Sequence, residues 1–287
     1  MKKHEHIVKS LMPGGIGEEL GIEPGDKLLA INGNEIQDVF DYYYYEESEQ
    51  LLLLIEKPDG EEWELEIEKD EDESLGIEFD QSLMDEYRSC RNKCMFCFID
   101  QMPKGMRETL YFKDDDSRLS FLQGNYITLT NMSDHDVERI VKYRLEPINI
   151  SFQTTNPELR CKMLHNRFAG EALKKVDILY RGQIEMNGQI VLCKGVNDGE
   201  ELERTIRDLT GYLPYLKSVS IVPVGLTKIS GRTVSSGAVY KRRCQGGAFC
   251  HPPLAGEDLS GAWDPHDPCG RRVVCAGRGG SAGGSAI

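Results

Sequence analysis

Three closely spaced cysteines are the residues of this chain whose types and spacing point most directly to chemistry. Cys90, Cys94 and Cys97 form a C-x3-C-x2-C motif. Three thiolates at such spacing can each bind one iron of a cubane 4Fe–4S cluster. The fourth iron then has no protein ligand, so a small molecule can bind it. The motif therefore predicts a cluster with one open coordination position.

Zinc is the main alternative partner of these thiols. Structural zinc commonly takes four ligands from paired C-x2-C units, but residues 81–228 contain no second pair. The other cysteines of that segment are the isolated Cys161 and Cys193, and Cys193 is predicted to be a small, buried side chain. Four later cysteines, with five, 18 and five intervening residues, match no common zinc pattern: Cys244, Cys250, Cys269 and Cys275.

Strands are predicted to alternate with helices in residues 81–228, around and after the motif. The expected strands are 126–130, 148–153, 184–193 and 218–224, with a short one near 83–87. The expected helices are 134–144, one that opens at Asn156-Pro157, 170–180 and 200–213. Strand–helix alternation with short loops is typical of a parallel sheet or barrel.

Residues 1–80 predict a separate, β-rich unit. Strands are expected at 7–10, 27–31, 50–56 and 63–68, and helices at 16–20 and 36–45. Asn32-Gly33 is a strong hairpin signal. In the last strand, Trp63, Leu65 and Ile67 alternate with glutamates, as in a strand with one apolar face.

The stretch P-G-G-I-G-E-E-L-G-I-E-P-G-D-K-L-L-A-I-N-G at 13–33 resembles the circularly permuted PDZ domains of bacteria, and the resemblance covers nearly all of residues 6–80. Ser74-Leu75-Gly76-Ile77 resembles the PDZ loop whose backbone amides hold a peptide C-terminus, while the peptide adds a strand to the sheet edge. The expected partner is therefore a peptide or protein C-terminus at Leu75, Gly76 and Ile77. The alternative is a PDZ-like unit that packs only against its own catalytic domain.

The cysteine motif, with the aromatic Phe96 directly before its last cysteine, resembles the radical S-adenosylmethionine (SAM) superfamily. The resemblance implies a 4Fe–4S cluster and SAM as cofactors, with the amino and carboxylate groups of SAM on the fourth iron. An electron from the cluster then cleaves SAM into methionine and a 5′-deoxyadenosyl radical, which abstracts hydrogen from a substrate. The implied partner is an electron donor such as a flavodoxin or ferredoxin. The alternative is a PDZ adaptor whose cluster is structural or redox-sensing.

Residues 6–228 as a whole resemble an uncharacterised bacterial family with a PDZ-like domain, a radical SAM core and a C-terminal domain of unknown function. The match is carried by C-R-N-K-C-M-F-C-F-I-D-Q-M-P at 90–103, K-G-M-R-E-T-L-Y-F-K-D-D-D-S-R-L-S-F at 104–121 and G-N-Y-I-T-L-T-N at 124–131. It implies an α/β fold, with a partial (β/α) barrel at 81–228 that carries its site at the C-terminal strand ends. The resemblance implies neither a substrate nor catalytic residues.

Two segments are expected to contact SAM. Where the superfamily has a Gly-Gly-Glu-like segment that meets the SAM amino group, this chain has Thr130-Asn131-Met132, whose polar side chains can still accept hydrogen bonds. Asn149, Ser151 and Gln153 share one face of the following strand, which predicts a barrel interior; a solvent-facing surface is the alternative.

A third segment, Val191 to Asp198, resembles the strand-to-loop region of these barrels. Asn197 either caps the next helix together with Asp198 or contacts SAM or substrate. The candidate SAM-binding residues are therefore Phe96, Thr130, Asn131, Ser151, Gln153 and Asn197. A charged cluster after the cysteine motif either lines the substrate site or pairs its own charges in a solvated loop: Arg107, Lys113, Asp114, Asp115, Asp116 and Arg118.

Charge and hydropathy exclude several classes of partner. Residues 1–80 hold 24 of the 48 acidic side chains and only six Lys or Arg, so nucleic-acid binding by this unit is not expected. No apolar run is long enough for a membrane helix, and no secretory leader follows Met1. We therefore expect a cytoplasmic, reducing location, where cysteines serve as metal ligands or buried thiols rather than disulfides.

Residues 229–287 differ in kind from the rest of the chain. They hold 12 of the 29 glycines and four of the nine cysteines, but only four Leu or Ile. The composition changes abruptly after Lys228, and we hypothesise a frameshifted reading of a GC-rich gene that leaves an aberrant, disordered tail. The barrel would then lack a strand and its trailing domain, so we expect cluster binding with slow turnover.

Overall fold

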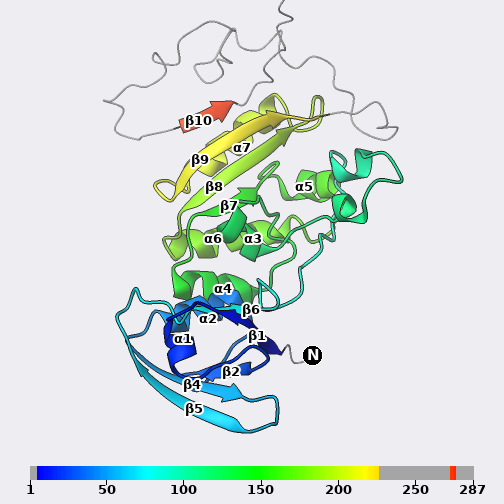
Figure 1. Cartoon of the computed structure of the whole chain (residues 1–287). Coiled ribbons are helices and arrows are strands. Elements are labelled where there is room, and N and C mark those ends of the chain that lie inside the picture. Colours follow the sequence, from blue (N-terminus) through cyan, green and yellow to red (C-terminus); the bar gives the residue numbers. More distant parts are fainter. Residues whose placement is uncertain (1–4, 226–271, 276–287) are drawn as a thin grey trace, which may run out of the picture. The chain divides into compact units, whose positions relative to one another are not determined.

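The computed structural model describes residues 5–225 and the backbone of 272–275, and the chain divides into two compact units, Met1–Tyr87 and Arg88–Ile287 (Figure 1). The first of these units extends to Tyr87. The strand predicted near 83–87 is wrong, because Leu83 is buried and its carbonyl accepts a hydrogen bond from the Val39 amide (3.1 Å). The tail predicted at 229–287 lies outside the described residues, apart from the strand at 272–275.

The first unit is an antiparallel sheet with two short helices. The strand order is β5-β4-β2-β1-β6, and β3 pairs with β2. This arrangement confirms the predicted β-rich unit, and β6 is a strand that the sequence pattern did not predict. In chain order the elements are β1 His6–Leu11, α1 Ile16–Glu19, β2 Lys27–Ile31, β3 Asn34–Glu35, α2 Val39–Glu46, β4 Gln50–Glu56, β5 Glu62–Glu68 and β6 Ile77–Phe79.

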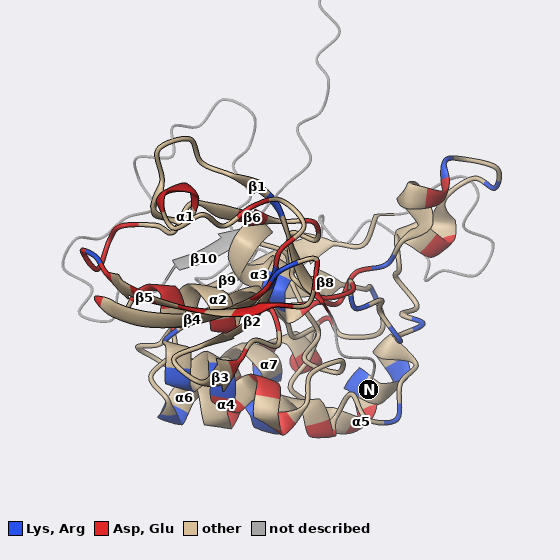
Figure 2. Ribbon diagram, turned by 60° about the horizontal axis from the view of Figure 1, so that its bottom comes forward, with Lys and Arg blue, Asp and Glu red and all other residues tan. Residues whose placement is uncertain are grey.

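Alternating side chains give the β4–β5 hairpin one apolar and one acidic face. Leu53 and Ile55 of β4 are fully buried, whereas β5 exposes a glutamate at every second position. Figure 2 shows the resulting acidic segments in this unit. Next to the hairpin turn, the buried Lys57 Nζ donates to Asp26 Oδ2 (2.7 Å), which ties β4 to the turn before β2.

The second unit contains the elements from η1 onwards. Most of the predicted strands and helices occur, and the helix α3 and the strand β10 were not predicted. The elements are η1 Ile99–Gln101, η2 Glu108–Tyr111, α3 Ser117–Gln123, α4 Asp134–Tyr143, β7 Ile148–Ser151, α5 Pro157–Leu164, η3 Glu171–Leu173, α6 Lys174–Arg181, β8 Met186–Leu192, α7 Glu200–Thr210, β9 Leu216–Pro223 and β10 Arg272–Cys275. None of the helices described in either unit is long and apolar enough to cross a membrane.

The sheet of the second unit is parallel, with the order β10-β9-β8-β7. Ile127 adds a parallel bridge to Ile150, so the segment predicted as the strand 126–130 lies beside β7, although only Ile127 pairs. Spatial neighbours are thus consecutive along the described chain, and helices connect β7 to β8 and β8 to β9. The described strands do not close into a barrel.

Helices cover one face of the parallel sheet. Ile150 of β7 and Met186 of β8 are fully buried in one apolar cluster with side chains from α4, α6 and α7. The cluster explains why these helices pack here, because each turns its apolar side chains toward the sheet. The helix-covered parallel sheet confirms the α/β class of this unit.

The other face of the sheet is polar and uncharged. Asn187 Nδ2 donates to Asn149 Oδ1 (3.1 Å), and Ser218 Oγ donates to Asn187 Oδ1 (2.8 Å), which links three neighbouring strands. The next row toward the C-terminal strand ends is made of Ser151, Gln189 and Ser220, which are register partners. Within the described part of the chain, these three side chains make no hydrogen bond to one another or to other residues.

Candidate functional site

Backbone hydrogen bonds hold the cysteine loop on both sides. Before the loop, the Cys90 amide donates to the Lys113 carbonyl (2.7 Å). Within the loop, the amides of Lys93 and Met95 donate to the carbonyls of Leu164 and Met163 (3.0 and 2.9 Å), at the end of α5. The loop is therefore fixed by two segments that lie far from it in the sequence.

The three thiols of the motif are partly buried, and Cys94 belongs to a satellite apolar cluster near the ends of β8 and β9. Cys94 and Phe96 pack there with Cys193 and Val224, among other side chains. Burial, together with the nearby charges of Cys90 and Cys97, raises the pKa of the Cys94 thiol to about 12. Burial also raises the pKa of Cys90. Bound metal would reverse this preference for the thiol, because a coordinated thiol is deprotonated.

The chemistry of the donor set bears on the kind of metal centre. Among the described residues, no three or more His, Cys, Asp or Glu side chains converge closely enough to hold one metal ion. A tetrahedral zinc ion would bring its sulfur ligands to roughly 3.8 Å from one another. A cubane cluster binds each thiolate at a different iron, so it spreads its ligands more widely. Three thiols of one loop are the donor set that a cubane cluster with one open position takes.

Asn92, inside the cysteine loop, connects the loop to the strand segment at Ile127. Its Nδ2 donates to Thr128 Oγ1 (3.0 Å) and Thr130 Oγ1 (2.9 Å), and its Oδ1 accepts from Asn166 Nδ2 (2.7 Å). Asn92 is only 4% exposed. These bonds hold the middle of the loop against the C-terminal end of a strand.

Asp115 is the acidic member of the same network. Its Oδ1 accepts from the Thr128 amide (2.7 Å), and its Oδ2 accepts from Thr128 Oγ1 (2.6 Å). Burial raises the pKa of Asp115, and the hydrogen bonds from Thr128 and Thr130 oppose that shift. A buried carboxylate thus lies within electrostatic reach of Cys90.

Arg160, on α5, is fully buried and donates hydrogen bonds to carbonyl groups from separate segments of the chain. Its guanidinium donates to the carbonyls of Thr128 (2.8 Å), Ser151 (2.9 Å) and Phe152 (2.9 Å), and also to that of Ala169. Burial lowers the pKa of Arg160 to about 10, and the charge of Asp115 opposes this shift. The side chain remains cationic at neutral pH and compensates Asp115.

Of the predicted SAM contacts, Phe96, Thr130 and Asn131 lie at the cysteine loop. Thr130 bonds to Asn92, and Asn131 Nδ2 donates to the Ser89 carbonyl (3.1 Å), next to Cys90. Ser151 is buried at the end of β7, on the polar face of the sheet.

Gln153 and Asn197 instead connect strand ends. Gln153 Oε1 accepts from the Val191 amide (2.6 Å), and Asn197 Nδ2 donates to the carbonyls of Gln153 (2.7 Å) and Val191 (3.0 Å). The prediction that Asn197 and Asp198 cap the next helix is wrong. The N-cap of α7 is Gly199, without a side-chain cap, and Asp198 accepts from the Gly195 amide. The Asn197 side chain does not cap the helix because it bonds to the carbonyls of Gln153 and Val191, which lie far apart in the sequence.

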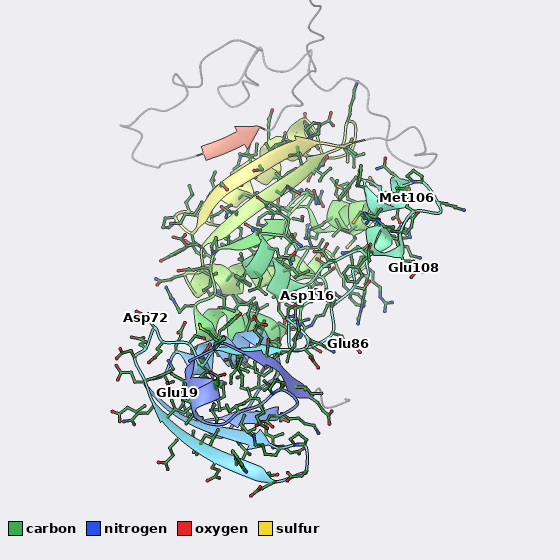
Figure 3. The ribbon with its side chains drawn as sticks, in the orientation of Figure 1. Glu19, Asp72, Glu86, Met106, Glu108 and Asp116 are labelled. Atoms are coloured by element: carbon green, nitrogen blue, oxygen red, sulfur yellow. The ribbon has the colours of Figure 1, made fainter. Side chains whose placement is uncertain are left out.

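The predicted charged cluster divides into buried and exposed members. Asp116 and Arg118 are buried and form an ion pair (2.7 Å), whereas Lys113 pairs with the exposed Asp100. Figure 3 shows Asp116 between the elements of the second unit. As predicted, Cys193 is fully buried. Sequence reasoning missed the roles of Asn92 and Arg160; the only local signal for Asn92 is its position between two cysteines.

The PDZ loop predicted to bind a carboxylate lies directly before β6. Leu75 is fully buried, and Gly76 has a φ of +70°. A Cβ on Gly76 would lie 2.9 Å from Met12 Cβ, so this position requires glycine. The loop is closed against β1, because the Met12 amide donates to the Gly76 carbonyl (2.8 Å).

Comparison with known families finds two domains, and the second match begins within the first unit. A PDZ domain family matches residues 7–57, and a radical SAM-like domain family matches residues 69–219, more than half of the chain. The chain therefore belongs to the radical SAM-like family and carries an N-terminal PDZ domain. The curated proteins include no match to it.

Proposed function

We propose that this chain is a radical SAM enzyme whose 4Fe–4S cluster is bound by Cys90, Cys94 and Cys97. The observation that carries the proposal is the position of the cysteine loop beside strand ends of the parallel sheet: Cys94 packs with Val224, and Asn92 of the same loop bonds to Thr128 and Thr130. When bound, the cluster and SAM supply a 5′-deoxyadenosyl radical that removes hydrogen from a substrate. The substrate is not indicated.

The chain's own residues hold the loop and exclude water. Asn92 fixes the loop to Thr128 and Thr130, and Arg160 holds the carbonyls at the strand ends. Phe96 packs into the apolar cluster behind Cys94. Low water access strengthens electrostatic interactions within such a site.

We assign the candidate SAM contacts two kinds of role. Phe96 and Ser151 contact SAM directly. For Ser151, the support is its hydroxyl on the polar sheet face, which makes no hydrogen bond to the described residues. Thr130 and Asn131 position the loop, because their side chains already bond to Asn92 and to the Ser89 carbonyl. Gln153 and Asn197 act through the strand ends that they join.

We infer that the parallel sheet is part of a partial (β/α) barrel. Its strand order follows the sequence without a reversal, whereas a doubly wound sheet reverses its order at a switch point. The polar face opposite the helices fits a lined barrel interior.

An acidic electron donor, such as a flavodoxin or ferredoxin, fits the surface near the cysteine loop. Residues 88–113 carry six Lys or Arg and two Asp or Glu, a net charge of 6 − 2 = +4. The segment also exposes Phe98 (60%), Met106 (49%) and Phe112 (44%). Figure 3 shows Met106 and Glu108 where this segment projects from the second unit. Opposite charge speeds the encounter of redox partners, and exposed aromatic side chains favour docking.

The PDZ domain suggests that the chain binds peptide C-termini, with Leu75, Gly76 and Ile77 as the proposed contacts. Loop amides of this kind capture a carboxylate while the peptide adds a strand to the edge of the sheet. β6 is an edge strand of the described sheet, which supports this role.

Anaerobic reconstitution tests the enzyme proposal. The full chain is refilled with iron and sulfide, reduced, and assayed for 5′-deoxyadenosine formed from SAM. We expect product from the wild type and none from Cys94→Ala. The matched control is Cys161→Ala, a partly buried thiol outside the motif, which should retain the cluster. A chain without iron or labile sulfide after refilling would refute the proposal.

The same preparation distinguishes the second candidate function, a PDZ adaptor with a structural or redox-sensing cluster. That protein would bind iron and sulfide through the three cysteines but form no 5′-deoxyadenosine. A zinc protein would contain stoichiometric zinc and show no visible absorption.

A further inference from the structure

The carboxylate of Glu46, at the end of α2, is buried against the loop that precedes β6. Glu46 is 9% exposed. Its Oε1 accepts hydrogen bonds from the Tyr42 hydroxyl (3.0 Å), the Ser74 hydroxyl (2.9 Å) and the Leu75 amide (2.7 Å). One oxygen of a buried carboxylate is thus held by three donors.

Two of these donors, Ser74 and Leu75, belong to the loop that a PDZ domain offers to a ligand carboxylate. The Leu75 amide points at Glu46, and the Gly76 amide donates to Ser74 Oγ (3.2 Å), whose own hydroxyl donates to Glu46. Two loop amides are therefore engaged within the domain. Backbone amides in such a loop form a concave anion site, and here a side-chain carboxylate takes the place of an external anion.

Aromatic packing connects the same helix to the edge strand. The ring of Tyr42 makes an edge-to-face contact with Phe79 of β6, with centroids 5.1 Å apart. Tyr42 is 4% exposed. Side chains of α2 thus contact both the loop and β6, so a peptide terminus entering the loop would displace Glu46 and disturb this packing.

We propose that Glu46 is an internal substitute for a peptide carboxylate and closes the PDZ loop to free C-termini. The inference rests on the proposed peptide-binding function of this domain. Hydrogen bonds to a charged group are stronger than those between neutral groups. An entering peptide carboxylate therefore breaks hydrogen bonds of Glu46 that are as strong as the ones it forms itself. Glu46 also competes at a high effective concentration, because it belongs to the same chain. Peptide binding therefore requires an event that moves α2 or Glu46.

The test measures peptide affinity of the full chain by fluorescence polarisation. The probe is a fluorescein-labelled pool of random octapeptides that end in valine, prepared with a free carboxylate or with a C-terminal amide. We expect Glu46→Ala to bind the carboxylate pool at least about tenfold more tightly than the wild type. Glu47→Ala, which changes the exposed residue directly after the same helix, should match the wild type. All three proteins should bind the amide pool weakly.

The outcomes separate the two ideas. Equal, tight binding by the wild type and Glu46→Ala would overturn the internal carboxylate and leave peptide binding intact. No binding by any variant would overturn both. If Glu46→Ala does not fold, Tyr42→Phe removes one donor to Glu46 but keeps the ring, and a gain in affinity is still expected.

Amide hydrogen exchange gives an independent readout in the wild type. The Leu75 amide should exchange much more slowly than the exposed Gly60 amide, whose carbonyl partner lies in a turn. Exchange of Leu75 as fast as that of Gly60 would overturn the proposal.

Discussion

Replacing Arg160 by methionine tests whether one buried cation organises the strand ends beside the cysteine loop. Arg160 is 0% exposed and donates to four carbonyl groups, so Arg160→Met leaves all four without this donor. At roughly 1 kcal/mol for each net hydrogen bond, the loss is about 4 kcal/mol. Asp115 also loses the favourable interaction with a buried positive charge, so the loss of about 4 kcal/mol is a lower bound.

The assay is urea unfolding followed by far-UV circular dichroism, which reports mainly on α3 to α7. With a slope of about 2 kcal/mol/M, the midpoint should fall by roughly 2 M. Arg160→Lys should recover only part of the loss, because an ammonium cannot reproduce the planar fork of donors. The control is Arg167→Met, an exposed arginine just beyond α5, which should change the free energy of unfolding by less than about 0.5 kcal/mol. A change in Arg160→Met no larger than in this control would refute the reasoning.

Three further predictions follow from described contacts. Asn92→Ala should lower the iron retained after reconstitution severalfold while Asn125→Ala retains it; equal iron contents would contradict the role of Asn92 in holding the loop. Asn197→Ala should cost about 2–4 kcal/mol in thermal or urea unfolding, because three buried hydrogen bonds are lost, and Asp198→Ala should cost less. Burial alone would raise the pKa of Asp116, but hydrogen bonds from Arg118 and the Arg88 amide outweigh it and lower that pKa. The stabilisation by Asp116 is therefore present above the unfolded-state pKa of about 3.9 and is lost as pH falls below it. Asp116→Asn should flatten the acid side of the stability curve, and an unchanged curve would contradict the assignment.

Local patterns predicted much of the fold. Ser133 forms a capping box at the start of α4, and Asn156 caps α5 with Pro157 at the first position. The Asn32-Gly33 hairpin and β4 occur as expected. Each of these signals is contained within a few neighbouring residues, so its effect on local structure does not depend on contacts with distant segments.

Contacts that join distant segments could not be predicted in this way. Asn92 and Thr130 are 38 residues apart, and no spacing rule relates them. Arg160 resembles a surface cation of an ordinary helix until the sheet buries it. Asn197 was expected either at a helix cap or in contact with SAM or substrate, because an asparagine before a helix looks the same whether it bonds to helix amides, to a ligand or to remote carbonyls. The cysteine motif, by contrast, could be recognised in the sequence, because its three thiols lie within eight consecutive residues.

The uncharged row of Ser151, Gln189 and Ser220 on the sheet determines how the affinity for a bound molecule depends on ionic strength. A molecule held on such a row is oriented by neutral hydrogen bonds, so added salt should leave its affinity nearly unchanged. The basic stretch at 88–113 would recruit its partner by long-range attraction, which salt screens over about 10 Å at 0.1 M. Added salt would then slow electron transfer from the partner, while the affinity for the molecule held on the neutral row would stay the same.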